Sequence, residues 1–465
     1  MHTTSQNSIN SRAHALVIGG SLAGLFAARV LSDHFERVTI LERDDVHDRP
    51  ESRKGQPQTR HLHGLLAQGL HIIKAFFPGI EQEMVEGGAI TGDMGRDMRW
   101  YQFDGYKTQF ESGLVGLMMS RPFLEWYIRR RVMSLPNVTL RPSCAVHEVI
   151  TTADRKRITG VQITNREQGS GTETLRTDLV IDAGGRGSVT PKWLASLGYE
   201  KPPQEEIKIR VGYASRLYRR RPGELVGAKM VMISPTPPAG KRGTFIMPVE
   251  NDRWIITAGG WAGDYPPADE AGFLAFVRSL PTSDIYDILR RAEPLSDIVT
   301  YRFPSNLRRH YEKLKRFPEG YLVMGDAVAS FNPIYGQGMT SAAMQARVLE
   351  KVLHQHRILT GLWKPYFQQV AKVVNMPWQM AAGEDFRYPE TEGKKPAFTD
   401  LINAYVAKVH LATHYDPVVY AHFLQVMNLL APPTSLMHPR IAWRIMFRQM
   451  GVAKEVPELE THGSY

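Results

Sequence analysis

The sequence predicts an α/β protein in which a parallel-sheet domain is interleaved with a mixed β-sheet domain and followed by C-terminal helices. Three observations predict this fold. The chain opens with a strand–turn–helix–strand pattern over residues 15–41, and a second strand–turn–helix pattern follows residue 321. Strand-forming residues dominate 207–257, and after residue 340 the pattern is mainly helical.

Length and composition are those of an ordinary globular chain. With 465 residues, 43% hydrophobic and 22% charged, roughly two to four domains can each bury a core. Disordered, collagen-like and disulfide-stapled proteins are excluded. The single cysteine, Cys144, fits a reducing compartment, and residues 1–11 lack the apolar stretch of a signal peptide, so we expect a cytoplasmic protein. The net charge of +10 fits an anionic cofactor as well as nucleic acid.

The first element is a βαβ unit. Apolar runs at 15–18 and 38–41 are typical of buried parallel strands, and residues 22–32 between them have helical spacing. The turn that joins the first strand to the helix is Gly19-Gly20-Ser21-Leu22-Ala23-Gly24. Glycines in such a turn let a pyrophosphate approach the backbone N–H groups at the positive end of the helix. The unit therefore predicts a dinucleotide site.

Two side chains refine this prediction. Ser21 replaces the middle glycine of the usual pattern and is small enough to keep the close approach. Glu42 ends the second strand, where a carboxylate accepts the ribose hydroxyls of an adenosine. A carboxylate at that position disfavours a 2′-phosphate, so NADP is not expected in this first site.

Two more turns follow apolar strands. The second motif is Asp182-Ala183-Gly184-Gly185-Arg186-Gly187-Ser188, for which a plain glycine-rich turn is the alternative. The third is Gly325-Asp326-Ala327, which leads into Asn332-Pro333-Ile334-Tyr335-Gly336-Gln337-Gly338-Met339-Thr340 and a helix. Asp326 could bind hydroxyl groups, and the amides at the start of the helix could face an electron-rich ring.

In this order and spacing, the three motifs resemble those of FAD-dependent monooxygenases with the para-hydroxybenzoate hydroxylase type of fold. The segment Gly55-Gln56-Pro57-Gln58-Thr59-Arg60-His61-Leu62-His63 looks like the GVPQxRHxH segment of a subgroup. That subgroup includes bacterial polyene and polyether epoxidases and is related more distantly to squalene monooxygenase. Residues 325–340 and 378–389 are similar to the same subgroup, so the resemblance covers most of the chain.

The resemblance implies a Rossmann-like FAD-binding domain of the GR2 type, interleaved with a mixed β-sheet substrate domain. The expected boundaries are 12–80, 116–200 and 306–360 for the FAD-binding domain, 81–115 and 201–305 for the substrate domain, and 361–465 for the C-terminal helices.

The resemblance also implies roles for individual residues. The first motif and Glu42 would hold the ADP half of FAD, with Arg43 near the adenine and Arg60 and Arg121 near phosphate or ribitol. Asp326 would bind the ribitol, and the helix start would lie at the N1/O2 edge of the flavin. The full set of expected cofactor-binding residues is Gly19, Gly20, Ser21, Leu22, Ala23, Gly24, Glu42, Arg43, Arg60, Arg121, Asp182, Gly325, Asp326, Gly336, Gln337, Gly338, Met339 and Thr340.

His61 and His63 are the candidate catalytic residues. Next to a flavin they could position substrate or relay protons near neutral pH, and hydrogen bonding to a loop is the structural alternative. No cysteine or HExxH pattern supports a metal site. Large apolar side chains of the middle region are candidates to line a lipophilic substrate, although plain core packing also explains them. The expected substrate contacts are Tyr213, Phe245, Met247, Trp254, Asn332 and Pro333.

The implied activity is a monooxygenase that inserts one atom of O2, through a flavin C4a-hydroperoxide, into a lipophilic natural product by epoxidation or hydroxylation. No second GxGxxG marks a nicotinamide site, so NAD(P)H would donate electrons transiently or through a separate reductase. The alternatives are an isoprenoid-reductase-like FAD enzyme that inserts no oxygen, and a non-enzymatic FAD-binding partner. The missing WxWxIP segment disfavours a halogenase.

The sequence offers two candidate surface interactions, with nucleic acid and with a membrane. The arginine clusters 129–131 and 219–221 lack interleaved aromatics, so nucleic-acid binding is not expected. The stretch 417–439 is too polar to span a membrane. It leads into a basic amphipathic segment that either packs as a C-terminal helix pair, the favoured interpretation, or rests peripherally on a membrane surface. The residues concerned are Leu429, Leu430, Met437, Arg440, Arg444 and Arg448.

Overall fold

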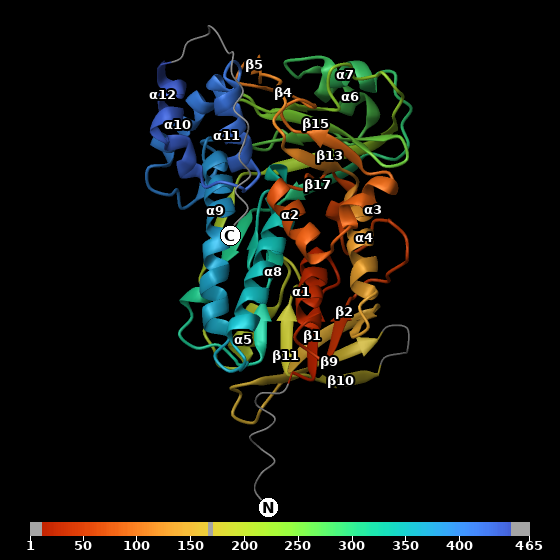
Figure 1. The fold of residues 1–465 in the computed structure, drawn as a ribbon, viewed down its shortest axis with the longest axis vertical. Coiled ribbons are helices and arrows are strands. Elements are labelled where there is room, and N and C mark those ends of the chain that lie inside the picture. Colours follow the sequence, from red (N-terminus) through yellow and green to blue (C-terminus); the bar gives the residue numbers. More distant parts are fainter. Residues whose placement is uncertain (1–11, 166–170, 448–465) are drawn as a thin grey trace, which may run out of the picture.

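The computed structural model describes residues 12–165 and 171–447. Its lower half in Figure 1 is built on a five-stranded parallel sheet. The order across this sheet is β19 (Tyr321–Val323), β11 (Leu179–Asp182), β1 (His14–Ile18), β2 (Arg37–Leu41) and β7 (Val138–Arg141). The predicted strand at 15–18, the helix at 22–32 and the strand at 38–41 are confirmed, because these runs are buried almost throughout.

Helices cover this sheet. Helix α1 (Leu22–Ser32) packs between α4 (Arg121–Met133) and α8 (Gln337–Gln355), and α8 also contacts α2 (Ala67–Phe76) and α9 (Trp363–Asp385). A three-stranded antiparallel sheet contacts β2 and β11 at the lower end of Figure 1. Its strands are β8 (Cys144–Thr151), β9 (Ile158–Asn165) and β10 (Thr172–Arg176).

The upper half holds a seven-stranded mixed sheet (Figure 1). Its order is β17 (Val299–Phe303), β13 (Val211–Arg219), β16 (Arg253–Gly260), β15 (Arg242–Val249), β14 (Met230–Ile233), β4 (Met98–Gln102) and β5 (Gly105–Tyr106). Strands β15 and β16, within the stretch predicted to be rich in strands, form a hairpin around residues 250–252, where Asn251 and Asp252 take the positive φ that such turns need. One face packs against α6 (Glu270–Arg278) and α7 (Asp284–Leu289), and the other against the C-terminal helices.

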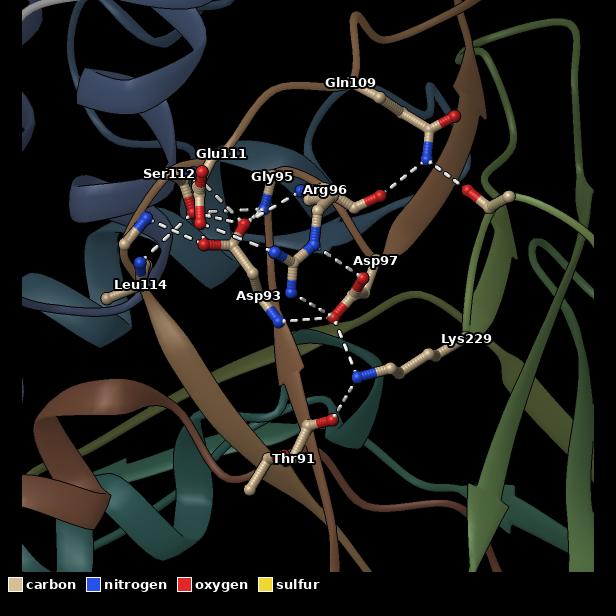
Figure 2. A network of polar contacts seen from close by, with 12 residues as sticks. Thr91, Asp93, Gly95, Arg96, Asp97, Gln109, Glu111, Ser112, Leu114 and Lys229 are labelled. Atoms are coloured by element: carbon tan, nitrogen blue, oxygen red, sulfur yellow. Dashed lines mark hydrogen bonds and ion pairs between the residues drawn. The ribbon is translucent and has the colours of Figure 1, made fainter.

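A buried carboxylate, that of Asp93, holds the loop that leads into strand β4 of this sheet. Asp93 accepts hydrogen bonds from the N–H groups of Gly95, Arg96 and Gly113 and from the Ser112 hydroxyl (Figure 2). Asp97, at the start of β4, pairs with Arg96 and Lys229. These contacts close the loop from β3 (Ile90–Asp93) to β4.

The C-terminal region is helical, as expected. It contains α9, α10 (Thr399–Ala412), α11 (Pro417–Met427) and α12 (Pro439–Phe447). Helices α11 and α12 pack together as the favoured interpretation expects, because they contact each other and Ile441 and Ile445 enter the core. Peripheral contact with a membrane stays a prediction. Arg448 and residues 1–11 lie outside the described residues. Within the described ranges, no helix is long and apolar enough to cross a membrane.

The predicted domain boundaries stay predictions. The remaining helices and strands of the described chain are short. They are α3 (Ile80–Glu86), α5 (Thr190–Ser196), α7, β6 (Val115–Met118), β12 (Gln204–Lys208), β18 (Asn306–Arg309), β20 (Ala329–Ser330), β21 (Glu392–Gly393) and the 3-10 helices Pro57–Arg60, Tyr311–Lys313, Gly325–Ala327, Pro333–Tyr335 and Pro433–Met437.

Candidate active site

The turn between β1 and α1 has room only for glycine at two positions. Gly19 has a φ of +101°, and a Cβ there would lie 2.7 Å from the Ala183 carbonyl oxygen. A Cβ on Gly24 would lie 1.8 Å from the Gly19 carbonyl oxygen. The helix and the turn therefore pack backbone against backbone, which leaves the N-terminus of α1 open to a phosphate.

An ion network lies directly beneath this turn. Glu42 accepts the Gly20 N–H at 2.9 Å and pairs with Arg53 at 3.0 Å. Arg53 also contacts Glu125 at 2.5 Å, and both side chains are almost fully buried. The Glu42 carboxylate, expected to accept ribose hydroxyls, is thus already oriented by a backbone amide and a guanidinium.

Glu125 connects this network to the turn itself. It accepts the Ser21 hydroxyl at 2.9 Å and pairs with Arg121 at 3.0 Å, while Arg121 donates to Ser21 at 3.2 Å. Sequence reasoning missed Arg53 and Glu125. Glu125 had a signal, since it stands four residues after Arg121, the spacing at which two side chains meet on a helix such as α4. Arg53 lies in an irregular segment without a motif.

Asp326 follows the carboxyl end of β19, and the Gly19 turn follows the carboxyl end of β1 in the same parallel sheet. Its carboxylate is exposed on one side, yet the surrounding protein raises its pKa to about 6, and the charges of Arg186 and Arg121 oppose that rise. The two guanidiniums are therefore near enough to Asp326 to act on the charge of its carboxylate. Arg186, a third residue that sequence reasoning missed, is held by hydrogen bonds to Ser305.

Asp182 is used within its own turn. Its carboxylate accepts the Gly184 N–H at 2.8 Å and the hydroxyls of Ser188 and Thr190 at 2.5 Å each. These bonds shape the turn that carries Arg186. The contact of Asp182 with a cofactor stays a prediction.

The start of α8 presents unpartnered polar atoms. Gly336 begins the helix in the left-handed conformation, with a φ of +65°. The side-chain oxygens of Gln337 and Thr340 are buried without a hydrogen-bond partner among the described residues. The first N–H groups of a helix also lack intrahelical acceptors. The helix N–H groups can donate and the Gln337 oxygen can accept a hydrogen bond, so this helix start fits the polar edge of a flavin ring, as the resemblance implies.

A buried carboxylate from α9 holds the loop before α8. Asp385 is fully buried and accepts Asn306 Nδ2 at 2.5 Å, Asn332 Nδ2 at 3.1 Å and the Tyr335 hydroxyl at 2.7 Å. Asn332 in turn accepts the hydroxyl of Tyr213. The network thus joins the loop before α8 to the seven-stranded sheet and to the C-terminal helices. Burial raises the pKa of Asp385 to about 6.

The two histidines lie next to strand β13 of the seven-stranded sheet. His61 Nδ1 is 2.7 Å from Ser215 Oγ, which is 2.6 Å from Thr257 Oγ1. His63 Nδ1 contacts the His61 carbonyl oxygen at 2.9 Å. Burial lowers the pKa of both imidazoles to about 4. Both are therefore neutral near pH 7, and the buried Nε2 of His61 has no partner in the described chain.

The lowered pKa of His61 predicts a pH-dependent stability. The unfolded chain takes up a proton at this ring near pH 6.5, and the folded chain only near pH 4. The free energy of unfolding therefore decreases by up to about 3 kcal/mol as the pH falls through this window. We expect His61→Gln to flatten the decline of stability between pH 6.5 and pH 4, measured by denaturant titration. Equal slopes for both proteins would contradict the burial of a neutral ring.

The predicted substrate residues divide between the two faces of the sheet. The register pairs Phe245 with Thr257 and Met247 with Ile255, so both predicted side chains share a face with Ser215. Trp254 lies on the opposite face, in the core beneath α6 and α7, and donates to Glu224. We therefore leave Trp254 out of the proposed substrate contacts.

The other predicted residues are placed as follows. Tyr213 and Asn332 are buried partners of each other, whereas Pro333 is exposed. Arg43 and Arg60 are exposed, and Arg43 lines a pocket of about 390 Å³ together with Arg53.

A parallel-sheet domain with this glycine turn, an aspartate after β19 and an open helix start defines a flavin-dependent oxidoreductase of the para-hydroxybenzoate hydroxylase fold type. The chain belongs to the family described as "FAD binding domain", whose model matches residues 12–358. FAD is accordingly the cofactor for which the site is built.

Other proteins resemble the chain over most of its length. "Protein Rv3254" of Mycobacterium tuberculosis is 32% identical over 435 residues, which are 90% of each chain. A flavoprotein/dehydrogenase from Cytophaga hutchinsonii has a TM-score of 0.64 at 15% identity, over 94% of this chain and 97% of that one. The flavin-dependent brominase Bmp2 has a TM-score of 0.63 at 12% identity, over 90% and 94%. Likenesses at such low identity show the fold alone.

Removing the carboxylate of Asp326 should weaken the retention of FAD. A hydrogen bond to a charged group contributes enough that Asp326→Ala should raise the Kd for FAD about tenfold or more. Because the pKa of Asp326 is about 6, retention by the native protein should also weaken as the pH falls through that value. Quenching of flavin fluorescence measures both effects. Asp297→Ala, at an exposed site, is the control, and unchanged affinity in Asp326→Ala would remove the ribitol role.

Proposed function

We propose that the protein is an FAD-dependent monooxygenase that inserts one oxygen atom from O2 into a lipophilic natural product, by epoxidation or hydroxylation. The observation that carries this proposal is an apolar cluster rich in methionine between the seven-stranded sheet and the C-terminal helices. Leu62, beside His61, and Met380 pack against this cluster. Met380 Sδ is 3.9 Å from Gln337 at the start of α8.

The arrangement supports oxygen transfer to an apolar substrate. Bound and reduced, FAD would supply the electrons that activate O2. One oxygen atom enters the substrate, the other leaves as water, and NAD(P)H is oxidised. The chain's own residues bind the cofactor at Arg121, Arg186 and Asp326, exclude water with apolar side chains, and offer the neutral His61 to hold or move a proton.

The decisive test is the fate of isotopically labelled O2. The FAD-loaded protein is supplied with NAD(P)H, with and without a separate flavin reductase, and with a panel of polyene and terpenoid alkenes. Label in an epoxide or alcohol supports the proposal. A product reduced at its double bond and free of label would overturn it in favour of the reductase alternative. Bleaching of the flavin without air, by NADH or NADPH alone, identifies a direct donor.

A further inference from the structure

The exposed apolar side chains of the described chain gather on its C-terminal helices. More than half of the large apolar residues that are exposed lie between residues 398 and 447. They are Phe398, Leu401, Ile402, Leu411, Met437, Trp443, Met446 and Phe447. We call this set the C-terminal apolar face. Large exposed apolar surfaces usually mark an interaction site.

Helix α12 is apolar on both of its sides. Ile441 and Ile445 are buried in the apolar cluster, on the side of α12 that meets α10 and α11, whereas Trp443 and Phe447 are exposed over 59% and 69% of their surfaces. An amphipathic surface helix would carry polar residues on that outer side. The outer side of α12 is therefore suited to a second apolar environment.

The face continues from α12 onto α10. Lys408 Nζ on α10 is 3.6 Å from Met446 Sδ on α12, and the Tyr405 hydroxyl donates to the Leu436 carbonyl at 2.7 Å. The two helices lie side by side at the outer edge of the molecule (Figure 1). Leu401 stands one turn before Tyr405, so it extends the same surface.

The charges around this face are unbalanced. Residues 394–447 contain two acids, Asp400 and Asp416. Asp400 pairs with Lys395 at 2.5 Å, and the buried Asp416 pairs with Arg444 at 2.8 Å. The exposed cations Lys394, Lys408 and Arg440 remain without an acidic partner among the described residues.

We propose that the C-terminal apolar face docks on the surface of an anionic phospholipid membrane. Aromatic side chains such as Trp443 prefer the headgroup level, and unpaired cations beside them are attracted to anionic headgroups. A second copy of the chain is a poorer occupant, because two faces with the same excess positive charge would repel each other.

Docking would bring the lipid close to the proposed substrate region. Ile441 and Ile445, on the inner side of α12, belong to the same apolar cluster as Met247. Phe245 packs against this cluster too. A lipophilic substrate dissolved in the membrane would then lie next to the cluster it has to enter. This consequence rests on the proposed function, whereas the docking itself does not.

The test is flotation of the full, FAD-loaded chain with vesicles. Vesicles of equal parts phosphatidylglycerol and phosphatidylcholine should bind the protein, and phosphatidylcholine alone should bind it less. The double variant Trp443→Ser with Phe447→Ser should lose at least about tenfold in vesicle affinity. Lys408→Gln should lose about fivefold on the anionic vesicles only. The control pair Val226→Ser and Ile358→Ser, exposed apolar residues on other elements, should bind like the native chain.

Four outcomes would overturn the docking proposal. The native chain fails to bind the anionic vesicles. The double variant at Trp443 and Phe447 binds them as well as the native chain does. Light scattering shows a dimer that the same double variant dissociates. Binding appears only in a chain that ends at Phe447, which would assign the face to residues 448–465. None of these results depends on oxygen transfer, so the proposed function would stand or fall separately.

Discussion

Glu125→Gln is expected to destabilise the FAD-free protein severely and the FAD-loaded protein much less. Glu125 is the shared partner of Arg53 and Arg121 beneath the glycine turn. Its substitution leaves Arg121 buried beside Ser21 without its acid. Breaking a buried ion pair in this way typically costs about 3–5 kcal/mol. The pyrophosphate of FAD carries negative charge to the same turn and should offset part of that loss.

Thermal unfolding with and without saturating FAD measures both parts of this prediction. The gap between the two midpoints should be wider in Glu125→Gln than in the native chain, because bound ligand stabilises only the folded state. Glu83→Gln is the matched control, since it breaks the half-exposed pair with Arg131 and should change stability by about 1 kcal/mol or less. Equal losses with and without FAD would show that the network does not face the pyrophosphate.

The elements that the sequence predicted well are those in which local pattern and tertiary burial agree. Residues 15–18 are apolar throughout, residues 38–41 are apolar except for Thr39, and both segments become inner strands of the parallel sheet. The glycine turn was predictable because its backbone contacts exclude any side chain.

The contacts that sequence analysis missed join distant segments. Arg53 meets Glu125 across 72 residues, and Asn332 meets Asp385 across 53 residues. No local periodicity encodes such pairs. The position of Trp254 differs from the prediction, because the register that the hairpin fixes pairs Trp254 with Pro248 and turns its side chain to the face of the sheet away from Phe245. Alternation within one strand does not supply that register.

Asp385→Ala is expected to destabilise the conformation of the loop that precedes α8. The substitution leaves the amides of Asn306 and Asn332 and the Tyr335 hydroxyl without their acceptor. Each unsatisfied buried donor costs about 1–3 kcal/mol unless water replaces the carboxylate. Asn332 would also lose its orientation toward Tyr213, so both FAD affinity and oxygen transfer should fall sharply. Glu384→Ala, the neighbouring half-buried acid, is the matched control.

Asp385→Asn separates charge from hydrogen bonding. Burial raises the pKa of Asp385 from 3.8 to about 6, so the folded chain holds this proton more tightly than the unfolded chain. Its contribution to stability is full below pH 4 and is lost as the pH rises through 6, a difference of up to about 3 kcal/mol. The asparagine variant lacks this term, so its stability relative to the native chain should improve between pH 4 and pH 7. A constant difference over that range would mean that Asp385 remains ionised in the fold and that the loop is held by a full negative charge.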